Sequence, residues 1–328
     1  MFPINVIIPT YNRKETLGKT LNSLKYQTMP FEQFEVIIVD DGSTEPSDEV
    51  IQETYPFHLR YIRQENQGDA AARNLGAQIS QAEILIFIDD DILVEPDYLD
   101  WMYQALRDKE KRIVMGITHL CTVNKYGGQG SQGDRSKLSQ GEYPHFVELC
   151  SNNMSLRRED YIAIGMMEGL GFPGSDIWCD VDFAYRAFMQ GYEFYRTPQA
   201  VAYHLDYVME NLESLSQRME KVGYRAAALF RKHPGLLPYL DMFRDKTPIQ
   251  WGVDSSGLVI RKLARRLAST GVSLGILKAM SRLMERFRLF PRAVQPIRRW
   301  IAGGYLNRGY RQGLQEFGSM PSMKDFYR

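Results

Sequence analysis

Hydrophobic and polar positions follow two alternating periods along the first hundred residues. Three short runs, Asn5–Thr10, Phe34–Asp40 and Glu83–Asp89, are almost continuously apolar and rich in β-branched residues. This pattern is typical of strands that are covered on both faces. The stretches with helical spacing are Arg13–Gln27, Pro46–Tyr55 and Asp69–Ser80, and a further short strand is predicted at His58–Ile62.

This order of elements predicts an α/β fold with a doubly wound, mostly parallel sheet. In such sheets, ligands bind outside the carboxyl ends of the strands. A polar cluster follows three of the predicted strands: PTYN (Pro9–Asn12), DDGS (Asp40–Ser43) and DDD (Asp89–Asp91). We therefore expect a ligand site at this edge of the sheet.

The pattern is less regular between residues 112 and 204. Phe146–Glu159 predicts a strand, a turn and the start of a helix, and the glycine-rich Tyr126–Asp134 predicts a mobile loop. Cys179–Phe194 has the spacing of a helix that Gly191 stops. We expect a catalytic domain over residues 1–208, with two halves that meet near residue 110, and a helical region over 209–328 that contains a linker near Asp254–Gly257.

Charge is distributed unevenly along a chain whose formal net charge is zero. Residues 1–250 hold 25 Lys/Arg and 36 Asp/Glu, whereas residues 258–312 hold 13 Lys/Arg and one acid, Glu285. Such a basic tail suits an anionic partner: a membrane surface, a nucleic acid or the acidic body of a neighbouring copy. Its apolar residues recur at helical spacing, which favours two interpretations equally, an amphipathic membrane-surface element or a helical subdomain packed on the body or on a second subunit.

Three cysteines match no zinc spacing and no disulfide framework, which predicts a reducing compartment. The sequence has no recognisable signal peptide and no apolar run of about 18 residues. We expect a cytoplasmic protein that does not cross the bilayer. If the tail binds lipid, the protein is peripheral on the inner face of the cytoplasmic membrane.

Three adjacent carboxylates, Asp89–Asp91, are unusual after an apolar strand, because neighbouring carboxylates repel and raise each other's pKa. A divalent cation removes this repulsion, and Mg²⁺ or Mn²⁺ suits carboxylate and phosphate oxygens. The alternative is a solvated turn in which Asp91 or Asp97 caps the next helix. The neighbouring polar clusters favour a metal–diphosphate site.

The other clusters each have two interpretations. The acids of DDGS accept hydrogen bonds from a nucleobase or ribose, or form an Asx turn at Gly42. Thr10 and Asn12 contact a nucleotide, cap a helix, or do both. Arg73 reaches a base or a phosphate, or is a surface arginine.

Taken in order, PTYNR, VDDGS, NQGDAAARN, FIDDD, NNMSLRRE and CDVDFAYRA closely resemble the family 2 glycosyltransferases, whose nucleotide-sugar-binding fold is called GT-A. The resemblance spans Asn5 to about His204. It implies an inverting enzyme that moves a sugar from a nucleotide-diphosphate donor to an acceptor hydroxyl, in polysaccharide, glycolipid or other glycoconjugate synthesis. A UDP-sugar is the expected donor, and a thymidine donor stays open.

The resemblance also implies roles for the donor-site residues. Asp41 is similar to the family's uracil-contacting acid, and Arg73 to its donor-binding arginine. Asp89–Asp91 resemble the metal-binding DxD element, with Asp91 as the direct ligand and Asp89 or Asp90 near the ribose. The implied donor contacts are Pro9, Thr10, Tyr11, Asn12, Asp40, Asp41, Arg73, Asp89 and Asp90, and the implied ligands of Mg²⁺ or Mn²⁺ are Asp91, Asp89 and His204.

Asp180 aligns with the last residue of the family's ED pair, where the catalytic base lies. Here Cys179 replaces the glutamate, which puts any orienting role of that residue in doubt, and Asp182 is a nearby rival. In an inverting reaction this carboxylate removes the proton of the attacking hydroxyl. Asn153–Arg158 is expected on the acceptor side, together with Trp178 and Tyr143.

Rival classes lack their own motifs. A nucleotidyltransferase would carry a glycine-rich, basic loop after the first strand, and an oxidoreductase would carry GxGxxG there, whereas the chain has PTYNRKET. A non-catalytic nucleotide-sugar-binding module of the same fold is disfavoured by its intact acids. Nucleic-acid binding is not expected, because no reading motif accompanies the basic tail.

Overall fold

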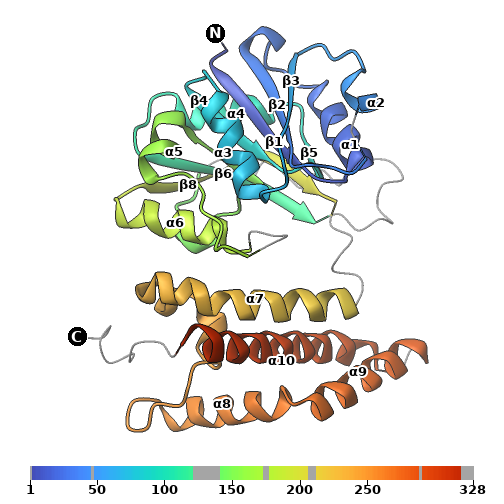
Figure 1. Cartoon of the computed structure of the whole chain (residues 1–328), viewed down its shortest axis with the longest axis vertical. Helices are drawn as coiled ribbons and strands as arrows, with labels where there is room; N and C mark the ends of the chain where they lie inside the picture. Colours follow the sequence, from blue (N-terminus) through green and yellow to red (C-terminus); the bar gives the residue numbers. More distant parts are fainter. Residues whose placement is uncertain are drawn as a thin grey trace. The chain divides into compact units, whose positions relative to one another are not determined.

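The computed structural model describes residues 2–45, 48–120, 141–172, 177–205, 212–287 and 290–318. The predicted glycine-rich loop Tyr126–Asp134 lies outside these residues. The chain forms two compact units, Met1–Tyr207 and Val208–Arg328, which are called the N-terminal unit and the C-terminal unit below (Figure 1).

The N-terminal unit is built on one eight-stranded sheet with the order β3-β2-β1-β4-β7-β6-β8-β5. Strands β3, β2, β1 and β4 are parallel neighbours, and every residue of β1, β2 and β4 is buried. The predicted doubly wound, mostly parallel sheet is confirmed. The bounds are β1 (Ile4–Thr10), β2 (Phe34–Asp40), β3 (His58–Arg63) and β4 (Ile84–Ile88).

Helices cover both faces of this half of the sheet (Figure 1). The larger core packs Leu17 and Leu21 of one helix and Leu99 of another against residues such as Val6 on one face. On the opposite face, Ala72 packs with Ile37 and neighbours on β2. The helices are α1 (Lys14–Leu24), α2 (Asp48–Ile51), α3 (Asp69–Ile79) and α4 (Tyr98–Leu106).

The irregular stretch of sequence contains two strands that the apolar pattern missed, over residues 112–120 and 193–204. β7 (Asn153–Arg157) is antiparallel to both β4 and β6 (Arg112–Leu120), and β8 (Glu193–His204) is parallel to β6. The last strand of the sheet order, β5 (Ile92–Val94), pairs antiparallel with β8. These strands are joined across long sequence separations, so their local pattern alone does not reveal them.

The prediction for Phe146–Glu159 was wrong in its first part. Phe146–Glu148 is a 3₁₀ turn, and the strand is β7, followed by α5 (Arg158–Ile164). The turn is held because the ring of Phe146 stacks on Phe188, with centroids 4.6 Å apart. The helix predicted within Cys179–Phe194 is confirmed as α6 (Cys179–Met189).

The C-terminal unit is helical. Its helices are α7 (Leu212–Lys232), α8 (Ser256–Ala268), α9 (Gly271–Arg286) and α10 (Pro291–Phe317). Helices α7 and α10 pack backbone to backbone, since a Cβ at Gly309 would lie 1.9 Å from Glu220 O. Phe230, Phe243 and Tyr310 form the aromatic centre of this core. None of the helices in the described residues is long and apolar enough to span a membrane.

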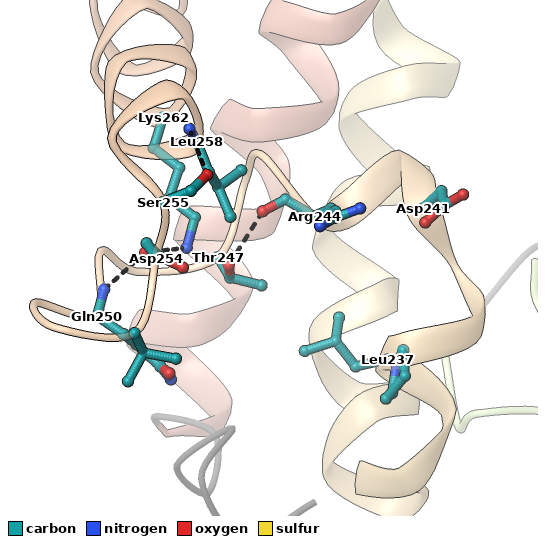
Figure 2. A pocket seen from close by; sticks show the side chains of 11 residues that line it. Leu237, Asp241, Arg244, Thr247, Gln250, Asp254, Ser255, Leu258 and Lys262 are labelled. Atoms are coloured by element: carbon teal, nitrogen blue, oxygen red, sulfur yellow. Dashed lines mark hydrogen bonds and ion pairs between the residues drawn. The ribbon is translucent and has the colours of Figure 1, made fainter. Parts of the chain in front are cut away.

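The linker expected near Asp254–Gly257 is instead a tied loop inside the C-terminal unit (Figure 2). The Asp254 carboxylate accepts hydrogen bonds from Gln250 N at 2.8 Å and from Lys262 Nζ at 2.7 Å. Ser255 caps α8 by accepting from Leu258 N. The prediction failed because the DSSG composition indicates a turn, whereas the buried Lys262 anchors that turn to the helix.

The small residues of α3 let the helix approach β1 closely. An added Cβ at Gly76 would lie 2.5 Å from Ile7 Cγ2 in a fully buried site. A Cβ at Gly18 of α1 would meet its nearest neighbour, Val50, at 3.8 Å, which is an ordinary contact. Both glycines therefore lie within helices, but Gly18 has room for an added Cβ and Gly76 does not.

We expect Gly76→Ala to destabilise the protein although alanine favours helix by about 1 kcal/mol. Overpacking costs about 1–3 kcal/mol, so the expected net loss in the free energy of unfolding is up to about 2 kcal/mol. The matched control, Gly18→Ala, should be neutral or stabilising. Urea unfolding followed by circular dichroism measures both, and a stabilised Gly76→Ala variant would contradict the close packing.

Candidate active site

A cleft of about 530 Å³ opens at the carboxyl ends of β1, β2 and β4. This is the edge of the sheet at which the polar clusters were expected to meet. The loop after β1, the end of β2, the start of α3 and the end of β4 all contribute to it. Its lining consists of Pro9, Thr10, Tyr11, Arg13, Asp41, Asn66, Gly68, Asp69, Arg73, Asp89 and Asp90.

Two residues from the expected donor set hold the loops behind the cleft together. The Asn12 amide oxygen accepts from Thr44 N at 2.8 Å, and Asn12 N donates to Ser43 Oγ at 2.9 Å. Asp40 is fully buried and accepts from Ser43 N at 2.7 Å and from the Tyr61 hydroxyl at 2.5 Å. The first acid of DDGS therefore holds the turn at Gly42 through a side-chain bond to the backbone three residues on.

The second acid, Asp41, lines the cleft and ties β2 to the loop before α3. Its carboxylate accepts from Gln64 Nε2 at 2.7 Å, Gln67 N at 2.9 Å and Gly68 N at 2.8 Å. Gly42, with φ of +84°, leaves no room for a side chain, because an added Cβ would lie 2.9 Å from Asn66 N. Asp41 thereby sets the position of the backbone that carries α3 and its arginine.

Arg73 is buried beneath the cleft and is not a surface arginine. Its guanidinium donates to Asp69 at 2.8 Å and to Asp89 at 2.5 Å, and its side chain is 2% exposed. Burial raises the pKa of Asp89, an effect that Arg73 opposes and that the nearby Asp91 reinforces. The i,i+4 spacing of Asp69 and Arg73 on α3 was the signal for this pairing, and sequence analysis overlooked Asp69.

A second arginine, Arg13, neutralises the remaining acids of the DDD cluster. Arg13 Nη1 lies 3.0 Å from Asp90 Oδ1 and 2.5 Å from Asp91 Oδ2, and Thr10 Oγ1 donates to Asp90 at 2.7 Å. Burial raises the pKa of Asp90 to about 6 in spite of these partners. Sequence analysis assigned no role to Arg13, although it stands at the end of PTYNR.

The alternative that the cluster caps a helix is not borne out. Asp97 occupies the N-cap of α4 but makes no capping hydrogen bond, and its carboxylate instead accepts from Trp101 Nε1 at 3.1 Å. Asp91 lies before β5 rather than at a helix. Asp89 and Asp90 line the cleft, and all three acids of the cluster pair with arginines.

Asp91 and His204 meet although they are far apart in sequence. Pairing of β5 with β8 sets Ile92 opposite His204, which brings His204 Nε2 to 3.3 Å from Asp91 Oδ1. Burial alone would raise the pKa of Asp91, but the His204 hydrogen bond and Arg13 together hold it below its usual value. This contact was expected only from the resemblance.

A carboxylate and an imidazole fit two positions around a divalent cation that takes its remaining oxygens from water and diphosphate. Asp91 and His204 supply this pair, whereas Asp89 is directed to Arg73. Across the described residues no group of three His, Cys, Asp or Glu side chains is arranged to hold a metal. Asp91 and His204 are therefore the pair of described residues that could hold a cation together with water and diphosphate oxygens.

Asp180 stands in the first turn of α6, after Trp178 in a left-handed conformation with φ of +78°. Burial raises its pKa to about 6, while the Val181 N–H and the positive charge of Arg73 act in the opposite direction. Arg73 and Asp69, which line the cleft, both act electrostatically on this carboxylate. An acid with a pKa near 6 is largely ionised at neutral pH and still basic enough to accept a proton.

Its rival, Asp182, is engaged elsewhere. Asp182 is fully buried, and its carboxylate accepts from Arg186 Nε at 2.9 Å. The replaced position, Cys179, is buried at 3% exposure and carries no second acid into the site. The geometry therefore leaves Asp180 as the candidate base.

A second hollow of about 320 Å³ lies on the side expected to take the acceptor. Asn153 borders it, with its amide held by the Tyr98 hydroxyl at 2.6 Å and by Thr118 at 2.9 Å. Cys150, whose side chain is exposed, also borders it.

Comparison with known proteins bears on the family and the fold of the chain. The family described as Glycosyl transferase family 2 matches residues 5–165. Validoxylamine A glucosyltransferase of Streptomyces hygroscopicus subsp. jinggangensis (strain 5008) is 43% identical over 106 residues, which are 31% of this chain and 25% of that enzyme. The match therefore spans about a quarter of that relative's length.

Solved structures show the same fold at low sequence identity. Mannosyltransferase PcManGT from Pyrobaculum calidifontis, in complex with GDP-Man and Mn²⁺, has a TM-score of 0.61 at 18% identity and covers 96% of this chain and 87% of its own. GalNAc-T7 with UDP, GalNAc and Mn²⁺ has a TM-score of 0.51 at 17% identity and covers 63% of this chain and 44% of its own. The matched residues hold the cleft and most of its acids, and this matched part of the chain belongs to glycosyl transferase family 2, with the GT-A fold.

Proposed function

We propose that this glycosyltransferase is an inverting enzyme that moves a sugar from a UDP-sugar to an acceptor hydroxyl with the help of Mg²⁺ or Mn²⁺. The observation that carries the proposal is the arrangement of charges around one cleft. Arginines and the Asp91–His204 pair lie at the strand ends, and Asp180, with its raised pKa, lies beside them. The arginines and the Asp91–His204 pair suit a metal-bound diphosphate, and Asp180 suits a proton transfer.

The donor would enter the cleft along the strand ends. Pro9, Thr10, Tyr11 and Asp41 line the part formed by β1 and β2, where a nucleobase and ribose would contact them. Tyr11 is 46% exposed and offers a ring face to a base. A uridine donor is supported by the GalNAc-T7 structure with UDP, whereas PcManGT holds GDP-Man, so the base is a point for experiment.

The cation, when bound, would neutralise the charge that builds on the departing diphosphate. Asp91 and His204 would hold it, and Arg73 would keep Asp89 in place through its buried ion pair. Arg73 Nε is buried without a hydrogen-bond partner among the described residues, so the guanidinium acts through its pairs with Asp69 and Asp89. Structures with Mn²⁺ among the similar proteins support a divalent metal.

Asp180 would remove the proton from the acceptor hydroxyl as that oxygen attacks the anomeric carbon. The new carbon–oxygen bond forms as the bond to the diphosphate breaks, so configuration inverts and no covalent enzyme intermediate is needed. The proton ends on the Asp180 carboxylate and the electron pair on the diphosphate. Most of the rate would come from positioning and from stabilised charge.

The acceptor would lie in the hollow bordered by Asn153, with Tyr143 as an exposed aromatic near Tyr195. Arg196, Glu142 and Glu148 form ion pairs at its rim, which suits a polar, hydroxyl-rich group. A hydroxyl on a glycan, a lipid-linked sugar or another glycoconjugate fits this chemistry. The role in envelope polysaccharide or glycolipid synthesis stays a prediction.

The donor proposal is tested by thermal shift with UDP, TDP, GDP and their sugars, each with Mn²⁺, Mg²⁺ or EDTA. A ligand that binds only the native state at 100 times its Kd stabilises it by about 2.7 kcal/mol, so the melting temperature should rise by several degrees. We expect one nucleotide to raise the melting temperature when metal is present, and to leave it unchanged when EDTA is present. Asp91→Ala should lose the metal-dependent rise.

Asp108→Ala is the matched control, because Asp108 is a remote acid whose side chain is 78% exposed. It should keep the full shift. If no nucleotide shifts the wild type, or if Asp91→Ala responds to metal as the wild type does, the proposed donor site is incorrect.

Asp180→Asn should leave the nucleotide-induced shift intact and lower kcat by about 10²–10⁴-fold, because general base catalysis is lost. In the wild type, kcat/KM should be level above the pKa of Asp180, about 6, and fall tenfold per pH unit below it, because the protonated acid cannot accept a proton. Initial rates of sugar transfer between pH 4.5 and 8.5 measure this profile. A low-pH limb that persists unchanged in Asp180→Asn would assign the base elsewhere.

A further inference from the structure

The C-terminal unit leaves a long apolar stripe uncovered on α8 and α9. On α8, Ile260, Leu263 and Leu267 recur at spacings of three and four residues and are 44–70% exposed. Such spacing puts them on one face of the helix. Single exposed apolar residues are ordinary, but a continuous stripe indicates a surface that binds something.

The stripe continues on α9. Val272, Ile276, Met280, Leu283 and Phe287 follow each other at spacings of four, four, three and four residues. Their exposed fractions range from 44% to 76%. The apolar residues that recur at helical spacing in this part of the sequence are therefore exposed and not part of a helical core.

The opposite faces of both helices are already used for folding. Leu258 and Lys262 of α8 and Leu274 and Ser281 of α9 are buried. Within this unit, α8 and α9 lie along α10 on the side away from α7 (Figure 1). The exposed stripe is therefore not needed to close the core of the C-terminal unit.

The start of α8 is held firmly by paired charges. Figure 2 shows Lys262 reaching back to Asp254, and its ammonium also donates to Pro248 O at 3.0 Å. The pocket of about 380 Å³ between these groups and Leu237 contains charges of both signs, Asp241 and Arg244 among them. We assign no ligand to this pocket. The buried Lys262–Asp254 pair fixes the rotation of α8 and thus the direction of its stripe.

Arginines flank the stripe. The exposed residues Arg261, Arg266, Arg282 and Arg286 each neighbour an exposed apolar residue in sequence, which places them about 100° around the helix from it. Residues 256–286 contain seven Lys/Arg and one acid, Glu285. An apolar stripe with a basic rim is typical of helices that lie in the interface of an anionic membrane.

We propose that the exposed face of α8 and α9 binds the surface of an anionic phospholipid bilayer. The apolar side chains enter the boundary between head groups and acyl chains, and the flanking arginines contact lipid phosphates. The face would hold the transferase at a membrane where lipid-linked acceptors reside. The binding itself depends on this face and not on the donor site.

The chemistry favours a bilayer over other occupants. A second copy that used the same face around a two-fold axis would bring one basic rim against another, which is repulsive. A nucleic acid would satisfy the arginines and leave the apolar stripe in contact with phosphates and water. A bilayer supplies both hydrocarbon and negative charge to the same surface.

The test is flotation of the full-length protein with vesicles of phosphatidylcholine alone or with 30% phosphatidylglycerol, without donor or metal. We expect binding to the anionic vesicles only, weakened as salt rises, because the Debye length falls from about 10 Å at 0.1 M to about 3 Å at 1 M. Arg266→Gln with Arg286→Gln should weaken partitioning roughly thirtyfold at low salt. Ile276→Glu should abolish the insertion of the stripe.

Tyr26→Glu is the matched control, because Tyr26 is a 73% exposed aromatic residue of the N-terminal unit. It should bind vesicles as the wild type does, and circular dichroism checks that every variant is folded. Failure of wild type to float with anionic vesicles overturns the proposal, as does equal flotation of Ile276→Glu. Sedimentation velocity would show whether the face instead joins two copies, an outcome that also overturns it, and neither result bears on the thermal-shift test of the donor site.

Discussion

The active site depends on how three successive carboxylates at the end of β4 are neutralised. Two like charges about 4 Å apart interact by about 4 kcal/mol at an effective dielectric constant of 20, so Asp89–Asp91 cannot be assembled without counter-charges. Arg73 from α3 pairs with the first acid, and Arg13 from the loop after β1 pairs with the other two. These pairs link three segments that are remote in sequence, and the cleft lies between them.

This arrangement connects the fold to the chemistry. Gly76 lets α3 approach β1, and Asp41 holds the loop before α3, so Arg73 reaches β4 from below the cleft. Removing one partner of a buried pair costs more than the pair contributes, because a bare charge remains. The site is therefore sensitive to each of its arginines.

Charged side chains are mostly buried around the site of the N-terminal unit and mostly exposed on α8 and α9 of the C-terminal unit. In the N-terminal unit, acids and arginines are buried together around a cleft, and Asp180 keeps a raised pKa beside them. In the C-terminal unit, Lys262 is buried in a pair, while arginines and apolar side chains share the outer faces of α8 and α9. The first arrangement suits a small, highly charged ligand, and the second suits an extended anionic surface.

Local pattern in the sequence determined β1, β2, β4, α1 and α3, because strands covered on both faces and amphipathic helices carry their own periodicity. The same holds for the polar clusters at the strand ends, whose common edge follows from parallel topology. Only the tertiary structure decided β6 and β8, the Asp91–His204 contact, and the pairing of Arg13 with Asp90 and Asp91. The physical reason is that strand register and ion pairing join residues that are far apart in the sequence. Arg13 and Asp90 are 77 positions apart, and Asp91 and His204 are further apart still. The local spacing of apolar residues carries no information about such contacts.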